Sequence, residues 1–213
     1  MNVFFNQKKL YNLSGERRMG SLQTAKILGG IGALLMLIGG IIPASFGVVS
    51  FIGFIMVFIA VKMIADETKE KAIFDNYLYS FIAGIIAFVV LIAMVFLVFT
   101  SVGGIEFFMG LQSSAMTNPM EIWETLQPVL FGAIAALIVF WIIAVIASLF
   151  YRKSFNLIAE KTGVKWFATA GLLIFIGTIT AIILVGFIIL LIGSIIEIVA
   201  FFSLPDKLEQ TEG

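Results

Sequence analysis

The chain has 213 residues, of which 61% are hydrophobic and 12% are charged, and its mean hydropathy is +1.14. Soluble chains average about 45–50% apolar and about 25% charged residues, so the composition excludes a water-soluble domain and predicts a multi-pass membrane protein. The chain has no Cys and no His, which excludes thiolate nucleophiles, Cys/His zinc sites and the Ser-His-Asp triad. Thirteen basic and thirteen acidic residues cancel, so bulk charge does not indicate nucleic-acid binding.

The first apolar run lies between Lys26 and Lys62, where 35 residues carry no charge. A bilayer core of about 30 Å needs only about 20 helical residues, so this run must turn back. Pro and Gly in Pro43–Gly47 predict the turn. The expected helices are Leu22–Ile42, with Ser21 as its N-cap, and Val48–Ala65.

The middle of the chain predicts two long helices, separated by a segment that has acidic but no basic residues. They cover Phe74–Thr100 and Pro128–Tyr151. The second is expected to begin at Pro128 because Pro is favoured in the first turn of a helix. Between them, Asn118–Glu121 predicts the capped start of a short interfacial helix. Trp123 would then lie at the headgroup level.

The last apolar run extends from Trp166 to Pro205 and has Glu197 as its one charge. As a single helix it would be about 57 Å long, so we expect it to double back at Val185–Gly186. The predicted helices are Phe167–Leu184 and Phe187–Leu204. The alternative is one crossing followed by an interfacial segment, which would make five crossings instead of six.

The positive charges predict the topology. With six crossings all thirteen Lys and Arg residues lie on one side, and the positive-inside rule makes that side cytoplasmic, with both termini. Five crossings would move only Lys207, so charge does not exclude them. We expect an all-α polytopic membrane helical bundle, arranged hairpin, long helix, long helix, hairpin. The expected domains are a polar basic extension over 1–20, a single transmembrane domain over 21–204 and a short polar cytoplasmic tail over 205–213.

Four parts of the chain together resemble a known family. They are the glycine-rich opening Ser21–Ala33, then Ile73–Tyr77, Ser154–Gly163 continued by Ala170–Leu173, and the closing Ala200–Ser203. The family they resemble is an uncharacterised, largely archaeal family of multi-pass integral membrane proteins, a domain of unknown function. The resemblance covers roughly Ser21 to Leu204 and leaves Met1–Gly20 outside, where Met19 could be an alternative start. It implies a prokaryotic membrane protein and carries over no activity or site residues.

Small residues recur four apart along the predicted helices. In lipid, burying apolar surface gains little, so close approach at small residues does much of the packing between helices. We expect these residues to make contacts within one bundle, and a homodimer interface is the alternative. The candidate packing residues are Ala25, Gly29 and Ala33, then Gly132 and Ala136, and then Gly177 and Ala181.

Glu197 is the candidate intramembrane polar site, because it lies among isoleucines about midway along the last predicted helix. A charge at that depth costs about 2.5–3.5 kcal/mol on insertion scales, so Glu197 is expected to be neutral or to have a partner. Lys62 is the nearest candidate partner by topology, unless its ammonium snorkels to the headgroups. The functional interpretation of Glu197 is a proton- or cation-binding carboxylate. The plain alternative is a protein-lined or interfacial Glu with no transport role.

Mixed charge after the second predicted helix indicates a solvated helix end. A divalent-metal site is the weaker alternative, since no loop has calcium-ligand spacing. The carboxylates concerned are Asp66, Glu67, Glu70 and Asp75.

The sequence favours a non-enzymatic component of a membrane complex, such as a subunit, scaffold or assembly component. The alternative is a small transporter or channel that uses Glu197. An enzyme ranks last, because no loop holds an acid/base pair or an activated nucleophile. No cofactor is expected. The expected partners are the lipid bilayer and other membrane subunits or a second copy of the chain, and not nucleic acid.

Overall fold

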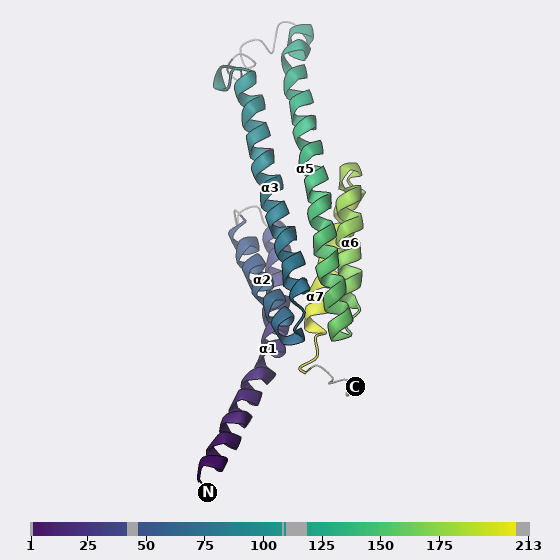
Figure 1. Ribbon diagram of the computed structural model, residues 1–213. Helices are drawn as coiled ribbons and strands as arrows, with labels where there is room; N and C mark the ends of the chain where they lie inside the picture. Colours follow the sequence, from purple (N-terminus) through teal and green to yellow (C-terminus); the bar gives the residue numbers. More distant parts are fainter. Residues whose placement is uncertain (1, 42–46, 108, 110–118, 208–213) are drawn as a thin grey trace. The chain divides into compact units, whose positions relative to one another are not determined.

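The computed structural model describes residues 2–41, 47–107, 109 and 119–207. Within those ranges the chain has helices and no strand, and six of its helical segments are long and apolar enough to cross a membrane. This confirms the predicted all-α membrane bundle, and α6 and α7 each qualify as a span, which favours six crossings over five. The elements (Figure 1) are α1 (Asn2–Ile41), α2 (Val48–Thr68), α3 (Lys71–Ser101), α5 (Pro119–Thr162), α6 (Trp166–Thr180), the 3-10 helix η2 (Ala181–Ile183) and α7 (Val185–Phe202).

The chain divides into two compact units. Unit 1 comprises Met1–Ser80 and Ser148–Gly213, and unit 2 comprises Phe81–Ala147. Unit 1 therefore holds the hairpins α1–α2 and α6–α7 with the first turns of α3 and the last turns of α5. Unit 2 holds the remainder of α3 and α5. No feature of the sequence predicted this division.

The first helix starts much earlier than predicted. It begins at Asn2, so the prediction of Ser21 as an N-cap was wrong: no Pro interrupts residues 2–41, and the helix runs on. Ser21 instead donates its hydroxyl hydrogen to the Glu67 carboxylate, which ties α1 to α2. Most of the predicted turn at Pro43–Gly47 lies outside the described residues. Gly47 is described, and it precedes α2 with a φ of 75°.

The turn between α2 and α3 is tighter than predicted. The second helix starts at Val48, as predicted, but ends at Thr68, three residues late. The third starts at Lys71, three residues early. Thr68 donates its hydroxyl to the Ile64 carbonyl at 2.7 Å, one turn back on the same helix. Lys69 then turns the chain with a φ of 53°.

The fourth span belongs to one helix of 44 residues, where the sequence predicted a separate interfacial helix and then Pro128–Tyr151. Pro128 lies inside α5, so both predicted ends were wrong. Membrane helices tolerate an internal Pro because neighbouring groups can satisfy the freed carbonyl, and Pro119 takes the first-turn position instead. The helix continues past Tyr151 until Gly163, which has a φ of 75° and donates its amide to the Ala159 carbonyl at 3.0 Å.

The last hairpin turns earlier than predicted. The helix ends at Thr180, η2 follows, and Leu184 reverses the chain with a φ of 63°. The predicted turn at Val185–Gly186 was therefore wrong by a few residues. Gly186 has a different role: it lies in the first turn of α7, and a Cβ there would overlap the backbone of Ala181. Glycine is needed at this position for close approach and not for the turn.

Aromatic rings form the centre of unit 1. Phe155 of α5, Phe167 of α6 and Phe201 of α7 are fully buried. Phe167 meets Phe201 edge to face at 5.0 Å and Phe155 at 5.4 Å between ring centroids, and such pairs contribute about 0.5–1.5 kcal/mol each. Phe201 also covers Gly29 of α1, where a Cβ would overlap its ring. One side chain therefore packs the last helix against the first.

This contact predicts the effect of a single methyl group. We expect Gly29→Ala to lower the free energy of unfolding by about 1–3 kcal/mol, because the added carbon would overpack the Phe201 ring. Gly40→Ala, in the same helix, is the matched control, since nothing lies within 4 Å of a Cβ there. Unfolding of the purified protein in detergent, followed by circular dichroism, measures both. Equal stability of the two variants would contradict the packing described.

Candidate functional site

Glu197 is buried in unit 1. Its relative exposure is 6%, and it precedes Phe201 by one helical turn, so both residues lie on the same side of α7. It lies twelve residues after Val185 and five before Phe202, which is about 18 Å and about 8 Å along the helix. The acid is therefore closer to the C-terminal end of the helix than the predicted midpoint.

Two tyrosines from other helices are the polar neighbours of Glu197. The carboxyl group interacts electrostatically with the hydroxyls of Tyr77 in α3 and Tyr151 in α5. The Tyr151 hydroxyl is buried and makes no hydrogen bond of normal geometry with the described residues, although Glu197 is near enough to interact with it. The Tyr151 ring stacks on Phe155 at 4.1 Å, which holds the phenol in place. The site is thus an acid beside a phenol whose hydrogen-bonding capacity is not filled.

No basic side chain lies within ion-pair distance of Glu197 in the part of the chain that the structure describes. The predicted partner Lys62 pairs with Asp66 at 3.4 Å and lies 5.1 Å from the centre of the Phe74 ring. The structure therefore does not bring Lys62 and Glu197 together. The i,i+4 spacing of Lys62 and Asp66 gave the lysine a nearer acid on its own helix.

The carboxylates after α2 do not gather into a metal site. Each one has its own partner: Asp66 pairs with Lys62 at 3.4 Å, Glu67 accepts from Ser21, Glu70 pairs with Lys161 at 3.0 Å, and Asp75 pairs with Lys71 at 3.7 Å. Among residues 2–41, 47–107, 109 and 119–207, no three His, Cys, Asp or Glu side chains are placed to hold a metal ion.

A groove of about 350 Å³ between α1 and α7 leads to Glu197. Phe187, near the start of α7, is 60% exposed, whereas Glu197 at the other end of the lining is buried. Ser194 donates its hydroxyl to the Leu190 carbonyl at 3.0 Å, so its hydrogen is already used. Glu197 is the one ionisable side chain among the residues that line the groove, which include Ala33, Met36, Phe187, Leu191 and Ser194.

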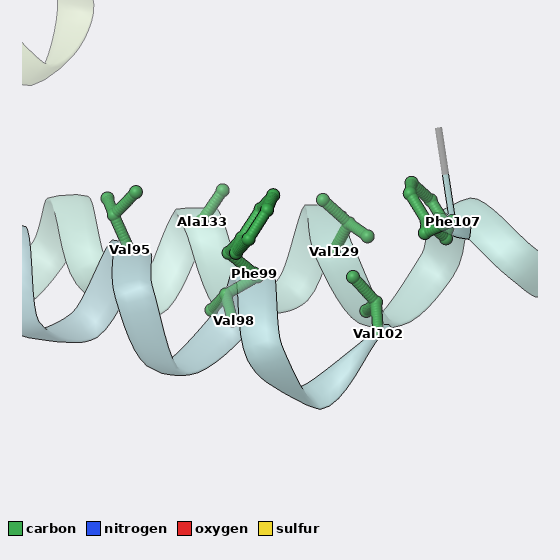
Figure 2. A pocket seen from close by; sticks show the side chains of 7 residues that line it. All are labelled: Val95, Val98, Phe99, Val102, Phe107, Val129 and Ala133. Atoms are coloured by element: carbon green, nitrogen blue, oxygen red, sulfur yellow. The ribbon is translucent and has the colours of Figure 1, made fainter. Parts of the chain in front are cut away.

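Unit 2 has a pocket of a different kind. It measures about 180 Å³, and Figure 2 shows that only hydrocarbon side chains of α3, of α5 and of the segment after α3 line it. Such a lining can hold another hydrocarbon, but it has no group for ion binding or catalysis. The lining residues are Val95, Val98, Phe99, Val102, Phe107, Val129 and Ala133.

The candidate packing residues lie at contacts inside each unit. In α1, Ala25 and Ala33 are buried on either side of Gly29, which Phe201 covers. In unit 2, Ala136 is buried, and a Cβ on Gly132 would overlap Val98 of α3. In the last hairpin, Gly177 faces Leu190 of α7, and Ala181 starts η2.

Sequence reasoning missed Tyr77 and Tyr151 as members of the site. Each lies close to a charge, Asp75 or Arg152, so each resembles an interfacial aromatic residue at the end of a span. Nothing in the local pattern distinguishes these tyrosines from Tyr79. Only the packing of α3, α5 and α7 together brings their hydroxyls to Glu197.

Comparison with known proteins agrees with the resemblance seen in the sequence. Residues 49–195 match a family described as "Protein of unknown function (DUF996)". The uncharacterized protein MJ1644 of Methanocaldococcus jannaschii is 35% identical over 188 residues, which cover 88% of this chain and 96% of that protein. No solved structure matches the chain. The predicted kinship with an uncharacterised archaeal family is thus confirmed; Tyr77 and Tyr151 lie within the matched range, and Glu197 lies two residues beyond it.

The ion pair between Glu70 and Lys161 predicts a pH dependence. The hydrogen bond and the charge of Lys161 hold the pKa of Glu70 below its ordinary value of 4.5, so this carboxyl stabilises the folded state above pH 4.5 and loses that contribution as the pH falls through its lowered pKa. We expect Glu70→Gln to remove this part of the acid sensitivity. The midpoint of thermal unfolding, measured from neutral to acidic pH, tests it. Glu106→Gln is the control, because Glu106 is exposed and outside the ion pairs of the described residues; identical pH profiles for Glu70→Gln and wild type would refute the expectation.

Proposed function

The chain belongs to the family of proteins of unknown function (DUF996), and from its site we propose that it is a membrane transport protein that binds a proton or a cation at Glu197. One observation carries the proposal: a carboxylate buried in a membrane-spanning helix faces a groove and lacks a basic partner. Ionisable residues inside spans are costly, and they commonly mark proton or ion pathways.

The surrounding residues suit a carboxylate that changes charge. When Glu197 is charged, the Tyr151 hydroxyl can donate a hydrogen bond to it. When a proton neutralises the carboxylate, the same hydroxyl can turn and accept a hydrogen bond from the carboxyl group instead. Tyr77 offers a second hydroxyl on the side of α3. The two phenols support both states of the acid without a fixed counter-ion.

The sequence alone favoured a component of a membrane complex, whereas the geometry of the site supports transport. A structural acid would be expected to have a fixed partner, as Glu70 has in Lys161. Glu197 has a groove beside it instead. The proposal includes no catalytic role. It keeps both termini on the cytoplasmic side of the cell membrane, because an even number of spans returns the chain to its starting side and the basic residues gather there.

Proton flux through reconstituted protein tests the proposal. In liposomes loaded with a pH-sensitive dye, we expect the wild type to dissipate an imposed pH gradient and Glu197→Gln to reduce the flux to the level of protein-free liposomes. Glu160→Gln is the matched control, since Glu160 is an exposed acid at the end of α5. Both variants should elute from size-exclusion chromatography like the wild type. Flux in Glu197→Gln equal to that of the wild type, or a wild type that moves neither protons nor Na⁺ or K⁺, would contradict the proposal.

A second candidate is a component of a membrane complex, and the length of two spans favours it. The charge-free parts of these spans, Asn76–Ser101 in α3 and Leu126–Tyr151 in α5, have 26 residues each, or about 39 Å. The bilayer core measures about 30 Å. A helix whose apolar stretch is longer than the bilayer core must tilt, thicken the bilayer around it or be covered by another protein. Unit 2 carries large exposed apolar side chains that a partner could cover, such as Phe96 and Phe131.

Purification from native membranes tests this candidate. Under it, we expect stable membrane proteins to co-purify with the wild type and to be lost from Phe96→Ala and Phe131→Ala, because truncating an exposed ring removes contact area without opening a cavity. Phe51→Ala, an exposed ring in α2, is the control. Loss of the same proteins from the control would remove the support for unit 2 as a docking surface.

A further inference from the structure

We propose that the groove between α1 and α7 binds a lipophilic organic monocation, whose charge Glu197 balances. This inference rests on the proposed function and deepens it by naming the class of ligand. It depends on three features of the groove: its charge, the chemistry of its walls and the position of its open end.

When Glu197 is ionised, the groove has one negative charge that no basic side chain of the described residues balances. On α1 the nearest basic residue is Lys26, which pairs with Asp206 at 3.6 Å. On α2, Lys62 pairs with Asp66, and α6 has no ionisable side chain. Tyr77 of α3 and Tyr151 of α5 are the other titratable groups near the acid, and both are neutral phenols at physiological pH. A ligand with a single positive charge would balance the site.

The walls favour an organic cation over a metal ion. A small hydrated cation would have to exchange its water for oxygen ligands, since hard cations need about six to eight of them. The side chains of the lining offer far fewer, namely the two carboxylate oxygens of Glu197 and the hydroxyl oxygen of Ser194. A quaternary ammonium holds its water weakly, and apolar and aromatic groups such as Met36 and Phe187 can surround it. The volume of about 350 Å³ lies within the range of about 300–1,000 Å³ typical of small-molecule sites.

The open end of the groove explains how such a ligand would arrive. Phe187 and Leu191 are exposed apolar residues on a membrane-spanning helix, and Glu197 lies about 15 Å beyond Phe187 along α7. A lipophilic cation dissolves in the bilayer and can enter from the side, so it needs no polar path through the protein. A scarcity of polar residues along the helices is then an expected property of the site. A proton and the cation would compete for the same carboxylate.

Binding of benzyltrimethylammonium to the full chain in lipid nanodiscs tests the inference by isothermal titration calorimetry. We expect wild type and Glu160→Gln to bind it and Glu197→Gln to bind it at least about tenfold more weakly. Leu191→Trp should narrow the groove and weaken binding, whereas Ile188→Trp, at an exposed position of α7 outside the lining, should not. Neopentylbenzene, the neutral molecule of the same shape, should not displace the cation. Binding should also weaken as the pH falls, because protons then occupy Glu197.

Several outcomes would overturn the inference. They are absence of binding to the wild type, equal binding to Glu197→Gln, and displacement by neopentylbenzene, each of which would show that charge recognition is missing. If Glu197→Gln does not fold, the two tryptophan variants decide instead. Cation binding that is equally strong in Leu191→Trp and Ile188→Trp would then overturn the inference. Proton flux that depends on Glu197 without cation binding would refute the ligand class and leave the proposed function standing. If proton flux and cation binding are both absent, the proposed function and the ligand class are both refuted.

Discussion

The packing of the Phe201 ring on the bare backbone of Gly29 joins the last helix to the first, and the candidate site depends on it. In a bilayer, apolar surface alone does not select a partner, because lipid tails are as apolar as side chains. Complementary shape must therefore select the partner helix, and a glycine opposite an aromatic ring provides such a specific fit. Phe155 and Phe167 hold the ring from the other side. Because Glu197 lies one turn from Phe201, this cluster also sets the direction in which the acid faces.

Glu197 stands out because several other polar side chains of the bundle have a hydrogen-bond or ion-pair partner on another group of the protein. Ser154, which is fully buried, donates to the Ile73 carbonyl at 2.7 Å, and Thr180 and Ser194 bond to carbonyls of their own helices. Glu70 has its lysine in the solvated turn. Burying an acid without such a partner costs several kcal/mol, and local packing gains nothing from it. A functional role would explain why the acid is present in a bundle that otherwise avoids this cost.

The two units differ in what their hollows can do, although both are lined by apolar side chains. The pocket of unit 2 offers only hydrocarbon contact, which lipid can provide anywhere along the bundle. The groove of unit 1 adds one acid and, near it, two phenols. A single ionisable group in low-dielectric surroundings interacts strongly with any charge that reaches it. The capacity for selective binding is therefore concentrated in unit 1.

The sequence by itself determined that the chain crosses a membrane five or six times, the approximate extent of most spans, the start of α2 at Val48 and the identity of Glu197 as the residue of interest. These features are local: peptide groups in lipid must bond within their own helix, and a lone charge in an apolar run is visible without coordinates. Only the tertiary structure decided that Lys62 pairs with Asp66 and that Leu184 makes the last turn. It also decided that Tyr77 and Tyr151 lie beside Glu197. The acid lies 120 and 46 residues along the chain from these tyrosines. No local pattern encodes such meetings, because they depend on how three separate helices rotate and pack against one another.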